Sequence, residues 1–489
     1  MTPPVFTARL SPAGLETSGP GEFRAGRRSI DGVCSGWSWE NRRLTVRRDR
    51  FGVQPLFWSV TPASVRISPS IDALLAAGVP AELDDAAMAV FLRVGFFVGD
   101  DTPFAAIRAV PAATAISWTP GHGTTTDGAW RYPRCSDISR SAAIVRFADC
   151  FDAAIARALR QTTDPVVVPL SGGHDSRHIL LAMHERGTMP DHCVTVHPYP
   201  PAAADDVAVA QTVAAALGVR HVLIPQRTHR LAAEREKNVL THYCSDEHVQ
   251  FLPLRDYFGR RRCEVFDGLA GDVLSQSQRL DALLHRDFVD GRFEAAAERI
   301  LGGTQTIEPA LARLLTRRGA ARFGRPLAVS RMAGEIARHA DAPNPIAGFF
   351  FFSRMRREVA LAPYAVLDVC QVSTPFLDAE LVDLMLSLPF ATVADRTLHT
   401  ETLLRRYPAW AHLPFDGKRK GQDDTRGVRR NAAALLRLAV GSRSATIDTR
   451  AIAARAARTL VSGVSAHIWF LPRMAQLLDV ERRYTEFTY

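Results

Sequence analysis

The feature that most constrains the fold of this chain is an apolar strand that runs through a glycine-rich turn into a helix. Residues 166–181 read VVVPLSGGHDSRHILL. The apolar run 166–170 is typical of a buried strand, and the periodicity that follows predicts a helix over 177–186. The adjacent glycines Gly172 and Gly173 allow backbone angles and close approaches that side chains forbid. The segment therefore predicts a strand–loop–helix unit of a parallel α/β sheet.

The loop of this unit is suited to a phosphate group. Its backbone N–H groups and the positive end of the following helix dipole together favour an anion. Asp175 supplies a carboxylate where Mg²⁺ on a bound pyrophosphate would lie, because proteins usually hold Mg²⁺ by one or two carboxylates plus phosphate oxygens. Ser171 and Ser176 add hydroxyl groups. The Walker A pattern, with its phosphate-binding lysine, is absent from the segment, so a P-loop NTPase is not indicated.

Strand and helix signals alternate with short connections after this loop. Further strands are predicted over 193–197 and 221–225, with a helix over 205–217 between them. A long amphipathic helix is predicted over 142–160, and residues 280–489 read as mostly helical. This part is expected to be an α/β domain with a parallel sheet and a helical C-terminal part.

The beginning of the chain has a different pattern. Short runs of aromatic and β-branched residues lie between turn signals up to about residue 125, which predicts a β-rich region. Residues 119–132 contain Gly, Thr, Asp and Pro and are expected to form a linker. We therefore predict two domains, residues 1–125 and 139–489.

Composition excludes several classes of protein. The 489 residues are 47% hydrophobic and 23% charged, which excludes a disordered or fibrous chain. The net charge of +9 suits an anionic ligand such as a nucleotide. No apolar run approaches the ~18 residues of a membrane span, and no signal peptide is visible. The seven cysteines form no C-x-x-C pair, so we expect a soluble protein of the reducing cytoplasm without disulfides or structural zinc.

Several motifs together resemble the asparagine synthetase family. SGGHDS at 171–176 is similar to the pyrophosphate loop of the N-type ATP pyrophosphatases, which cleave ATP between the α- and β-phosphates. RDRFGVQPLFW at 48–58, FDGLAGDVL at 266–274 and STPFLDAELVDLMLSLP at 373–389 resemble other segments of the family. The resemblance implies a shortened, antiparallel β-rich glutamine amidotransferase-like domain of the Ntn-hydrolase kind. A parallel-sheet synthetase domain, similar to the adenine nucleotide hydrolases, would follow it.

The same resemblance implies a nucleotide and metal site. It places Mg²⁺ on Asp175 and Asp272, and catalytic roles on Asp272 and Lys420, with Lys418 as the competing lysine. A lysine there would stabilise charge on the phosphoryl group and on the tetrahedral intermediate. The residues implied to bind ATP are Leu170, Ser171, Gly172, Gly173, Asp175, Ser176, Val196, Asp267 and Gly268.

The sequence departs from the family in two places. The family's glutaminase nucleophile is a cysteine exposed by removal of Met1, whereas Thr2 stands here and the first cysteine is Cys34. The segments that hold glutamine have no counterpart, so we expect no glutamine hydrolysis. Leu269 occupies the position of a catalytic glutamate, and leucine cannot accept a proton from a nitrogen nucleophile.

The implied function is that of an ATP- and Mg²⁺-dependent carbon–nitrogen ligase that releases AMP and pyrophosphate. A substrate carboxylate would be adenylated and then attacked by an amine. Two alternatives remain open. One is an intramolecular cyclase of the β-lactam synthetase or lasso-peptide cyclase kind, and the other is a nucleotide-binding pseudoenzyme. Transfer RNA thiolation is disfavoured because it commonly uses cysteine pairs. The expected partners are a small-molecule or peptide carboxylate and an amine donor, with no nucleic acid or membrane; a homodimer is left open.

Two histidines adjoin the loop. His174 and His178 are four residues apart and share one face of the predicted helix. That spacing could hold a metal ion, but no third ligand is evident. We expect a loop residue and a partly exposed helix residue.

Overall fold

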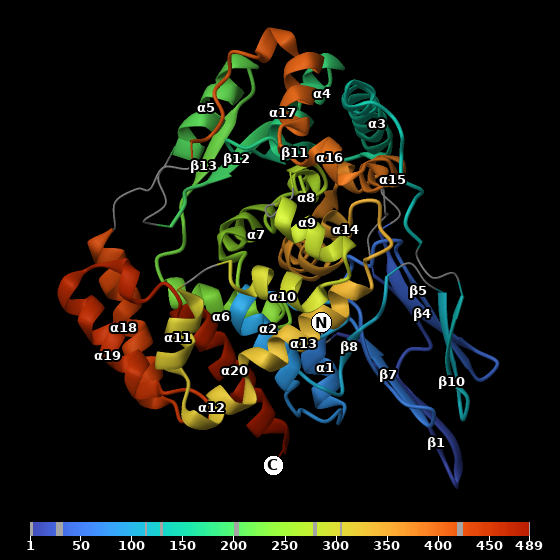
Figure 1. The fold of residues 1–489 in the computed structure, drawn as a ribbon, viewed down its shortest axis with the longest axis vertical. Coiled ribbons are helices and arrows are strands. Elements are labelled where there is room, and N and C mark those ends of the chain that lie inside the picture. Colours follow the sequence, from blue (N-terminus) through green and yellow to red (C-terminus); the bar gives the residue numbers. More distant parts are fainter. Residues whose placement is uncertain are drawn as a thin grey trace.

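The computed structural model describes residues 3–25, 33–112, 115–127, 131–199, 205–276, 281–303, 306–417 and 424–488. Two antiparallel sheets form the N-terminal part, and a parallel sheet with many helices forms the rest (Figure 1). This arrangement confirms the fold class expected from the sequence. Among the residues described, no helix is long and apolar enough to cross a membrane.

The N-terminal sheets are five-stranded, in the orders β2-β1-β7-β6-β8 and β10-β9-β5-β4-β3. One apolar core, which includes Phe6, Trp58 and Trp118, joins strands of both sheets. The strands are β1 Phe6–Ser11, β2 Gly14–Ser18, β3 Glu22–Ala25, β4 Ser35–Glu40, β5 Arg43–Arg48, β6 Phe57–Val60, β7 Ser64–Ser68, β8 Arg108–Ala109, β9 Ala115–Thr119 and β10 Gly123–Asp127.

Strand β10 corrects the expectation of a linker over 119–132. It pairs antiparallel with β9, with Thr124 opposite Trp118. The three threonines of β10 are β-branched and suit a pleated strand, while the glycines that led us to predict a linker form the hairpin turn. Residues 119–127 therefore contain a hairpin turn and a strand.

The parallel sheet has the order β13-β12-β11-β14-β15. The chain moves outward from β11 on one side and from β14 on the other, so the strand order reverses between these two strands. Ligands of open α/β sheets bind at the carboxyl ends of the strands at such a point. The strands are β11 Val166–Pro169, β12 His192–Val196, β13 His221–Ile224, β14 Glu264–Phe266 and β15 Gln371–Ser373.

Helices surround this sheet and build the C-terminal part. Several begin at a capping side chain, as α2 does at Asp84, whose carboxylate accepts a hydrogen bond from the backbone N–H of Ala87. The helices up to residue 337 are α1 Ile71–Ala76, α2 Asp85–Val94, α3 Arg140–Gln161, α4 Asp175–Glu185, α5 Asp205–Ala216, α6 Arg230–Leu240, η1 Val249–Phe251, α7 Leu252–Phe258, α8 Gly271–Gln276, α9 Ala282–Val289, α10 Phe293–Leu301, α11 Ile307–Leu314, α12 Arg317–Arg322 and α13 Arg325–Ala337. Those that follow are α14 Pro345–Phe350, η2 Phe351–Val359, η3 Ala362–Val366, η4 Pro375–Leu377, α15 Ala379–Ser387, α16 Phe390–Val393, α17 Leu398–Arg406, η5 Pro408–Trp410, α18 Thr425–Gly441, α19 Thr449–Ser462, η6 Ser465–His467 and α20 Leu471–Thr488.

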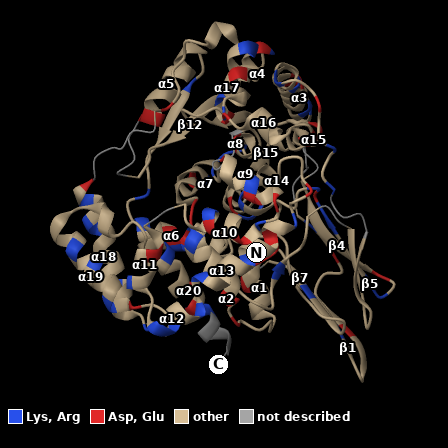
Figure 2. Ribbon diagram, in the orientation of Figure 1, with Lys and Arg blue, Asp and Glu red and all other residues tan. Residues whose placement is uncertain are grey.

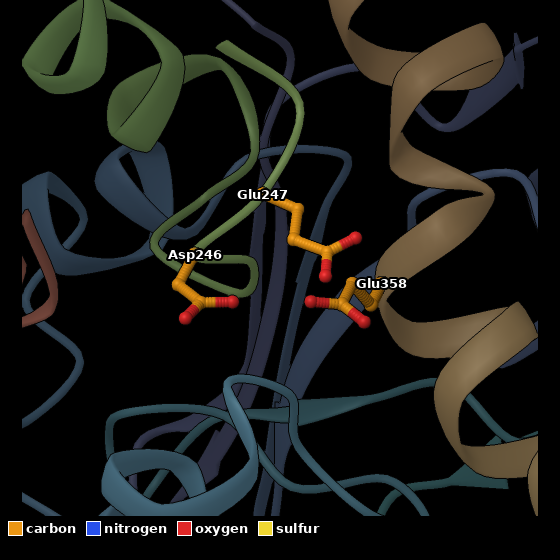
Figure 3. A group of neighbouring side chains, drawn as sticks. All are labelled: Asp246, Glu247 and Glu358. Carbon is orange, nitrogen blue, oxygen red and sulfur yellow. The ribbon is translucent and has the colours of Figure 1, made fainter. Parts of the chain in front are cut away.

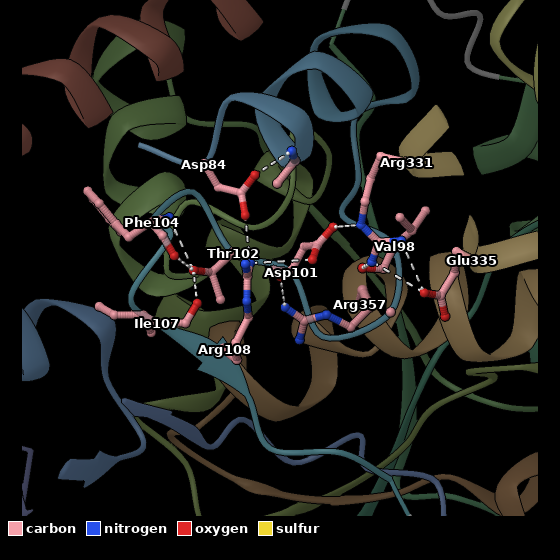
Figure 4. Close-up of polar contacts among 12 residues, drawn as sticks. Asp84, Val98, Asp101, Thr102, Phe104, Ile107, Arg108, Arg331, Glu335 and Arg357 are labelled. Atoms are coloured by element: carbon pink, nitrogen blue, oxygen red, sulfur yellow. Dashed lines mark hydrogen bonds and ion pairs between the residues drawn. The ribbon is translucent and has the colours of Figure 1, made fainter. Parts of the chain in front are cut away.

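A buried polar hub ties the N-terminal part to these helices (Figure 4). The carboxylate of Asp101 accepts a hydrogen bond from Arg331 of α13 at 2.7 Å, and its backbone carbonyl accepts one from Arg357 at 2.7 Å. Arg108 contacts the same carboxylate at 3.4 Å and also that of Asp84 at 2.8 Å. Arg331 and Arg357 therefore bind Asp101 across the contact between the two parts.

Candidate active site

The glycine-rich loop lies between β11 and α4, at the carboxyl end of the sheet. Its two serines hold the turn closed. The backbone N–H of Ser171 donates to Oγ of Ser176 at 3.0 Å, and the two hydroxyl oxygens lie 3.1 Å apart. The N–H of Gly173 donates to Oγ of Ser171 at 3.3 Å. The hydroxyl groups expected to meet a ligand therefore also shape the loop itself.

Gly172 is required because two acidic residues crowd it. A Cβ atom at this position would lie 2.8 Å from Cβ of Asp416 and 3.1 Å from Oδ1 of Asp206. The N–H of Gly172 donates to Oδ1 of Asp206 at 2.6 Å, and its carbonyl accepts from the N–H of Asp416 at 3.1 Å. Sequence reasoning missed both aspartates. Asp206 stands in the first turn of α5, and only the fold places a carboxylate against the loop.

A group of carboxylates converges next to the loop. The N–H of Asp272 donates to Oδ2 of Asp175 at 3.0 Å, and Oδ1 of Asp267 accepts from the N–H of Leu269 at 2.9 Å. A Cβ at Gly268 or Gly271 would lie 2.7 or 2.5 Å from Asp175 side-chain atoms. The two glycines thus allow the segment after β14 to bring Asp272 against the start of α4. Four of the residues expected to bind ATP or metal, Asp175, Asp267, Gly268 and Asp272, are together here.

The carboxylates are half-buried, at a cost that a cation would offset. Burial raises the pKa of Asp175 well above its usual value, and the charges of Asp272 and Asp267 raise it further. Burial also raises the pKa of Asp267 to about 6. Oδ1 of Asp175 is buried and accepts no hydrogen bond from the part of the chain that the structure describes. An oxygen-only set with one open buried acceptor suits Mg²⁺, which prefers carboxylate and phosphate oxygens.

Two buried histidines, His178 and His399, lie next to this group of carboxylates. Nδ1 of His178 lies 3.0 Å from Nε2 of His399 on α17, and Nδ1 of His399 lies 3.1 Å from Oγ of Ser275. His178 is fully buried, so the expectation of a partly exposed helix residue was wrong. Its ring packs among phenylalanines that are distant in sequence, Phe147, Phe151 and Phe376, and burial lowers its pKa to about 3.

Two segments of the chain match known families. Residues 33–130 match the model of the glutamine amidotransferase domain, and residues 146–249 match that of asparagine synthase. Together the two matches support an asparagine synthetase-family protein. Its N-terminal part is a short glutamine amidotransferase-like domain, and its second part supports an ATP-dependent ligase. No curated protein matches the sequence.

The matched asparagine synthase segment contains the glycine loop but ends before the other half of the site. Asp267, Gly268 and Asp272 lie beyond residue 249, and only the fold connects them to the loop. Leu170 directly follows β11 and Val196 ends the neighbouring strand β12, with Leu170 buried and Val196 half-buried. Both therefore lie at the carboxyl ends of paired strands, close to the glycine loop.

The segment that leads to the expected catalytic lysine is anchored over the loop. The ring of Phe415 stacks on His174 at 4.4 Å on one side, and the guanidinium of Arg177 lies 3.9 Å from its centroid. Arg177 also donates to the carbonyl of Leu413 at 3.2 Å. Lys418 and Lys420 follow this segment and lie outside the described residues.

A second acidic group, Asp246, Glu247 and Glu358, lies between the loop after α6 and η2 (Figure 3). Arginines balance it. Arg473 donates to Asp246 at 2.7 Å, and Arg354 donates to Glu358 at 3.1 Å and to Glu247 at 3.4 Å. Burial, with the charges of Glu247 and Asp246, raises the pKa of Glu358 well above its usual value. The arrangement is an ion-pair network that joins the loop after α6 to η2 and α20.

The glutamine amidotransferase-like domain has a cysteine in a poor setting for catalysis. Cys34 precedes β4 and is half-buried. Burial raises the pKa of its thiol, and the nearby charge of Asp49 raises it further. The reactive form of cysteine is the thiolate, so both effects make Cys34 a weak nucleophile. Thr2 lies outside the described residues.

Proposed function

We propose that this protein is an ATP- and Mg²⁺-dependent ligase that adenylates a substrate carboxylate and then joins it to an amine, releasing AMP and pyrophosphate. One observation carries the proposal. Asp175, Asp267 and Asp272 converge on the SGGHDS loop at the point where the strand order reverses. These half-buried carboxylates repel one another, and a metal ion bound with pyrophosphate at the helix N-terminus would remove that repulsion.

In this proposal the chain's own residues mainly position the substrates and neutralise the negative charge of the phosphates. Asp175 and Asp272 would hold Mg²⁺, which supplies positive charge opposite the leaving pyrophosphate. The N–H groups of Gly172 and Gly173 would donate hydrogen bonds to the phosphates. In this structure they donate to Asp206 and Ser171, so pyrophosphate would have to replace these two acceptors. Lys420 would stabilise the charge that develops on the acyl phosphate.

The second candidate is an intramolecular cyclase, in which the attacking amine belongs to the same substrate. Leu269 does not separate the two candidates, because an internal amine must lose a proton just as an external amine must. A cavity of about 1140 Å³ at the carboxyl ends of β12 and β13 favours the cyclase, because it suits a substrate larger than an amino acid. Tyr199, Leu223, Arg430 and Trp469 are among its lining residues.

ATP–pyrophosphate exchange tests the adenylation step. Purified protein would be assayed with Mg²⁺ over aspartate, other carboxylate metabolites and peptides. We expect exchange with one class of carboxylate, and its loss in Asp175→Ala and Asp272→Ala. Asp164→Ala is the matched control, because Asp164 lies before the amino end of β11 and the glycine loop follows its carboxyl end.

The products separate the candidates. Intermolecular ligation joins two molecules, whereas cyclisation yields one product lighter than the substrate by one water. If the protein binds ATP but gives no exchange with any carboxylate, and Asp175→Ala binds ATP equally well, the ligase proposal fails. A nucleotide-binding pseudoenzyme would then be the better description.

A further inference from the structure

A second cavity, of about 590 Å³, lies among the helices near the carboxyl end of the chain. Its walls come from α6, α12, α18, α20 and the connection that follows α18. Figure 1 shows these helices in the lower part of the molecule, whereas α4 and the glycine loop lie at the top. None of the residues assigned above to the ATP or metal site lines it.

Arginine dominates the lining of this cavity. The arginines are Arg235, Arg318, Arg322, Arg437, Arg443 and Arg482, against the two acidic residues Asp479 and Glu481. Figure 2 shows Lys and Arg along α12 and along the packed pair α18 and α19. The cavity therefore has a concentrated positive charge within a chain whose overall excess is only +9.

Some of this charge is already neutralised inside the fold. Arg235 binds Asp479 through both nitrogens, with distances of 2.6–3.0 Å. Arg322 binds Asp85 of α2 in the same way, at 3.0 and 3.1 Å through Nε. These two ion pairs connect the helices that line the cavity, and Arg235 neutralises the charge of Asp479.

Three arginines of the lining have no such partner. Arg318, Arg437 and Arg443 are exposed, and no ion pair or hydrogen bond within the described ranges involves their side chains. Arg318 comes from α12, Arg437 from the last turns of α18, and Arg443 from the connection after it. Like charges gathered around one cavity repel each other, and an anion between them would remove that repulsion.

The lining also offers a surface that is not charged. Leu83, Leu438 and Leu478 form apolar wall, and the hydroxyl groups of Ser444 and Thr446 donate to Glu481 beside it. A small inorganic anion would occupy only part of a cavity of this volume, which lies in the range of small-molecule sites. The arginines and leucines of the lining thus indicate a ligand with several negative charges and an apolar portion.

We propose that this cavity binds a small organic phosphate, of the kind represented by a nucleotide, at a site separate from the adenylation site. The guanidinium group is planar and bidentate, which matches phosphate oxygens better than an ammonium does. Phosphate esters and polyphosphates carry the multiple charges that three arginines can neutralise. The inference does not depend on the proposed ligase activity.

Binding would be tested with ATP, AMP and inorganic pyrophosphate as probes, in low salt and without Mg²⁺. Calorimetry gives the affinity, and hydrogen–deuterium exchange shows where each probe protects the backbone. We expect protection of residues 437–446 and of α12 by ATP. Arg437→Glu/Arg443→Glu should weaken that binding by about tenfold or more, which corresponds to the loss of one good charge contact. The matched control is Arg450→Glu/Arg458→Glu, which changes the charge equally on the adjacent α19 outside the cavity.

The probes also separate recognition of the phosphate groups from recognition of the rest of the ligand. Protection by pyrophosphate as strong as that by ATP would assign recognition to the phosphates, and weaker protection would assign part of it to the leucine wall. The neutral variant Arg437→Gln/Arg443→Gln serves if charge reversal disturbs folding. Absence of protection over 437–446 with all three probes at millimolar concentration would overturn the proposal. So would equal affinities of the cavity variants and the control.

Discussion

Nδ1 of His399 lies 3.5 Å from Oδ1 of Asp175, so a buried ring from α17 supports the carboxylate that begins α4. Burial lowers the pKa of His399 well below its usual value, and the charges of His178 and His174 lower it further. The ring is therefore neutral and does not cancel the charge of Asp175. The charge of Asp175 therefore remains for a cation to neutralise.

The buried histidines should make the protein sensitive to acid. The pKa of His178 is lowered from 6.5 to about 3, so between these values the unfolded chain binds a proton that the folded chain does not. Stability from this residue is complete above pH 6.5 and falls by about 1.4 kcal/mol per pH unit below it. His178→Phe keeps the ring among its aromatic neighbours and removes the titration. Relative to wild type, the variant should gain about 2 kcal/mol between pH 6.5 and 5.

Urea unfolding of both proteins from pH 5 to 7.5 measures this difference. Asp175 and Asp267 act in the opposite direction, because their raised pKa values favour the folded state at low pH. Their contribution is common to both proteins and cancels in the comparison. Parallel curves of unfolding free energy against pH would show that His178 is not held neutral.

Gly271 should be essential for adenylation. A methyl group there would lie 2.5 Å from Cγ of Asp175 and would displace the carboxylate. A misplacement of about 1 Å can cost about 100-fold in rate, so we expect a loss of that order in pyrophosphate exchange for Gly271→Ala. Gly334→Ala is the control. A Cβ at Gly334 meets nothing within 4 Å on α13, and the change should preserve activity and stabilise the helix by about 0.5–1 kcal/mol.

The sequence predicted the elements that local chemistry determines. The apolar strand, the paired glycines and the aspartate of the SGGHDS loop predicted a strand–loop–helix unit, and β11 and α4 confirm it. The alternation that followed predicted β12, α5 and β13. Asp267 and Asp272 could be related to the loop only through family resemblance, because more than 90 residues separate Asp272 from Asp175.

The remaining parts of the site depend on tertiary packing. Asp206 and Asp416 contact Gly172 from α5 and from the segment after η5, and no local pattern marks either residue. His399 joins His178 across 221 residues. The linker predicted over 119–132 was wrong over 119–127, because the turn residues there outweighed the strand signal of the three threonines, and residues 128–130 lie outside the described residues.

The hub at Asp101 should carry much of the coupling between the two parts of the chain. Its side chain is 8% exposed and pairs with Arg331, which is 24% exposed. Removing one partner of a buried pair leaves the other charge uncompensated, so Asp101→Ala should lower the free energy of unfolding by about 3 kcal/mol. Asp164→Ala removes a pair with Arg262, which is 85% exposed, and should cost less than about 1 kcal/mol. Equal losses in urea unfolding would contradict this assignment.

The glutamine amidotransferase-like domain should not release ammonia from glutamine. The thiol of Cys34 is held protonated by burial and by the charge of Asp49. We expect no glutamate formation above the buffer rate when glutamine is supplied with ATP and Mg²⁺. Cys34→Ala should leave pyrophosphate exchange unchanged. Glutamate production that disappears in this variant would assign a nucleophile to Cys34 and refute the prediction.

Asp206 should control the affinity of the glycine loop for phosphate. Its Oδ1 accepts the N–H of Gly172 at 2.6 Å, the donor that a pyrophosphate would use. Burial and the charge of Asp416 raise the pKa of Asp206, whereas the bond from Gly172 lowers it. Asp206→Asn keeps an oxygen acceptor at this position and removes the negative charge that repels a phosphate.

We therefore expect Asp206→Asn to bind magnesium pyrophosphate about five- to tenfold more tightly, which corresponds to about 1–1.4 kcal/mol. Asp205→Asn is the control, because it removes the same charge one residue earlier in α5, whereas the N–H of Gly172 donates to Asp206. Calorimetry of both variants and of wild type measures the change. Weaker binding by Asp206→Asn alone would mean that the carboxylate is needed to keep the loop in its binding conformation, because a charge that only competed with phosphate could not help to bind it.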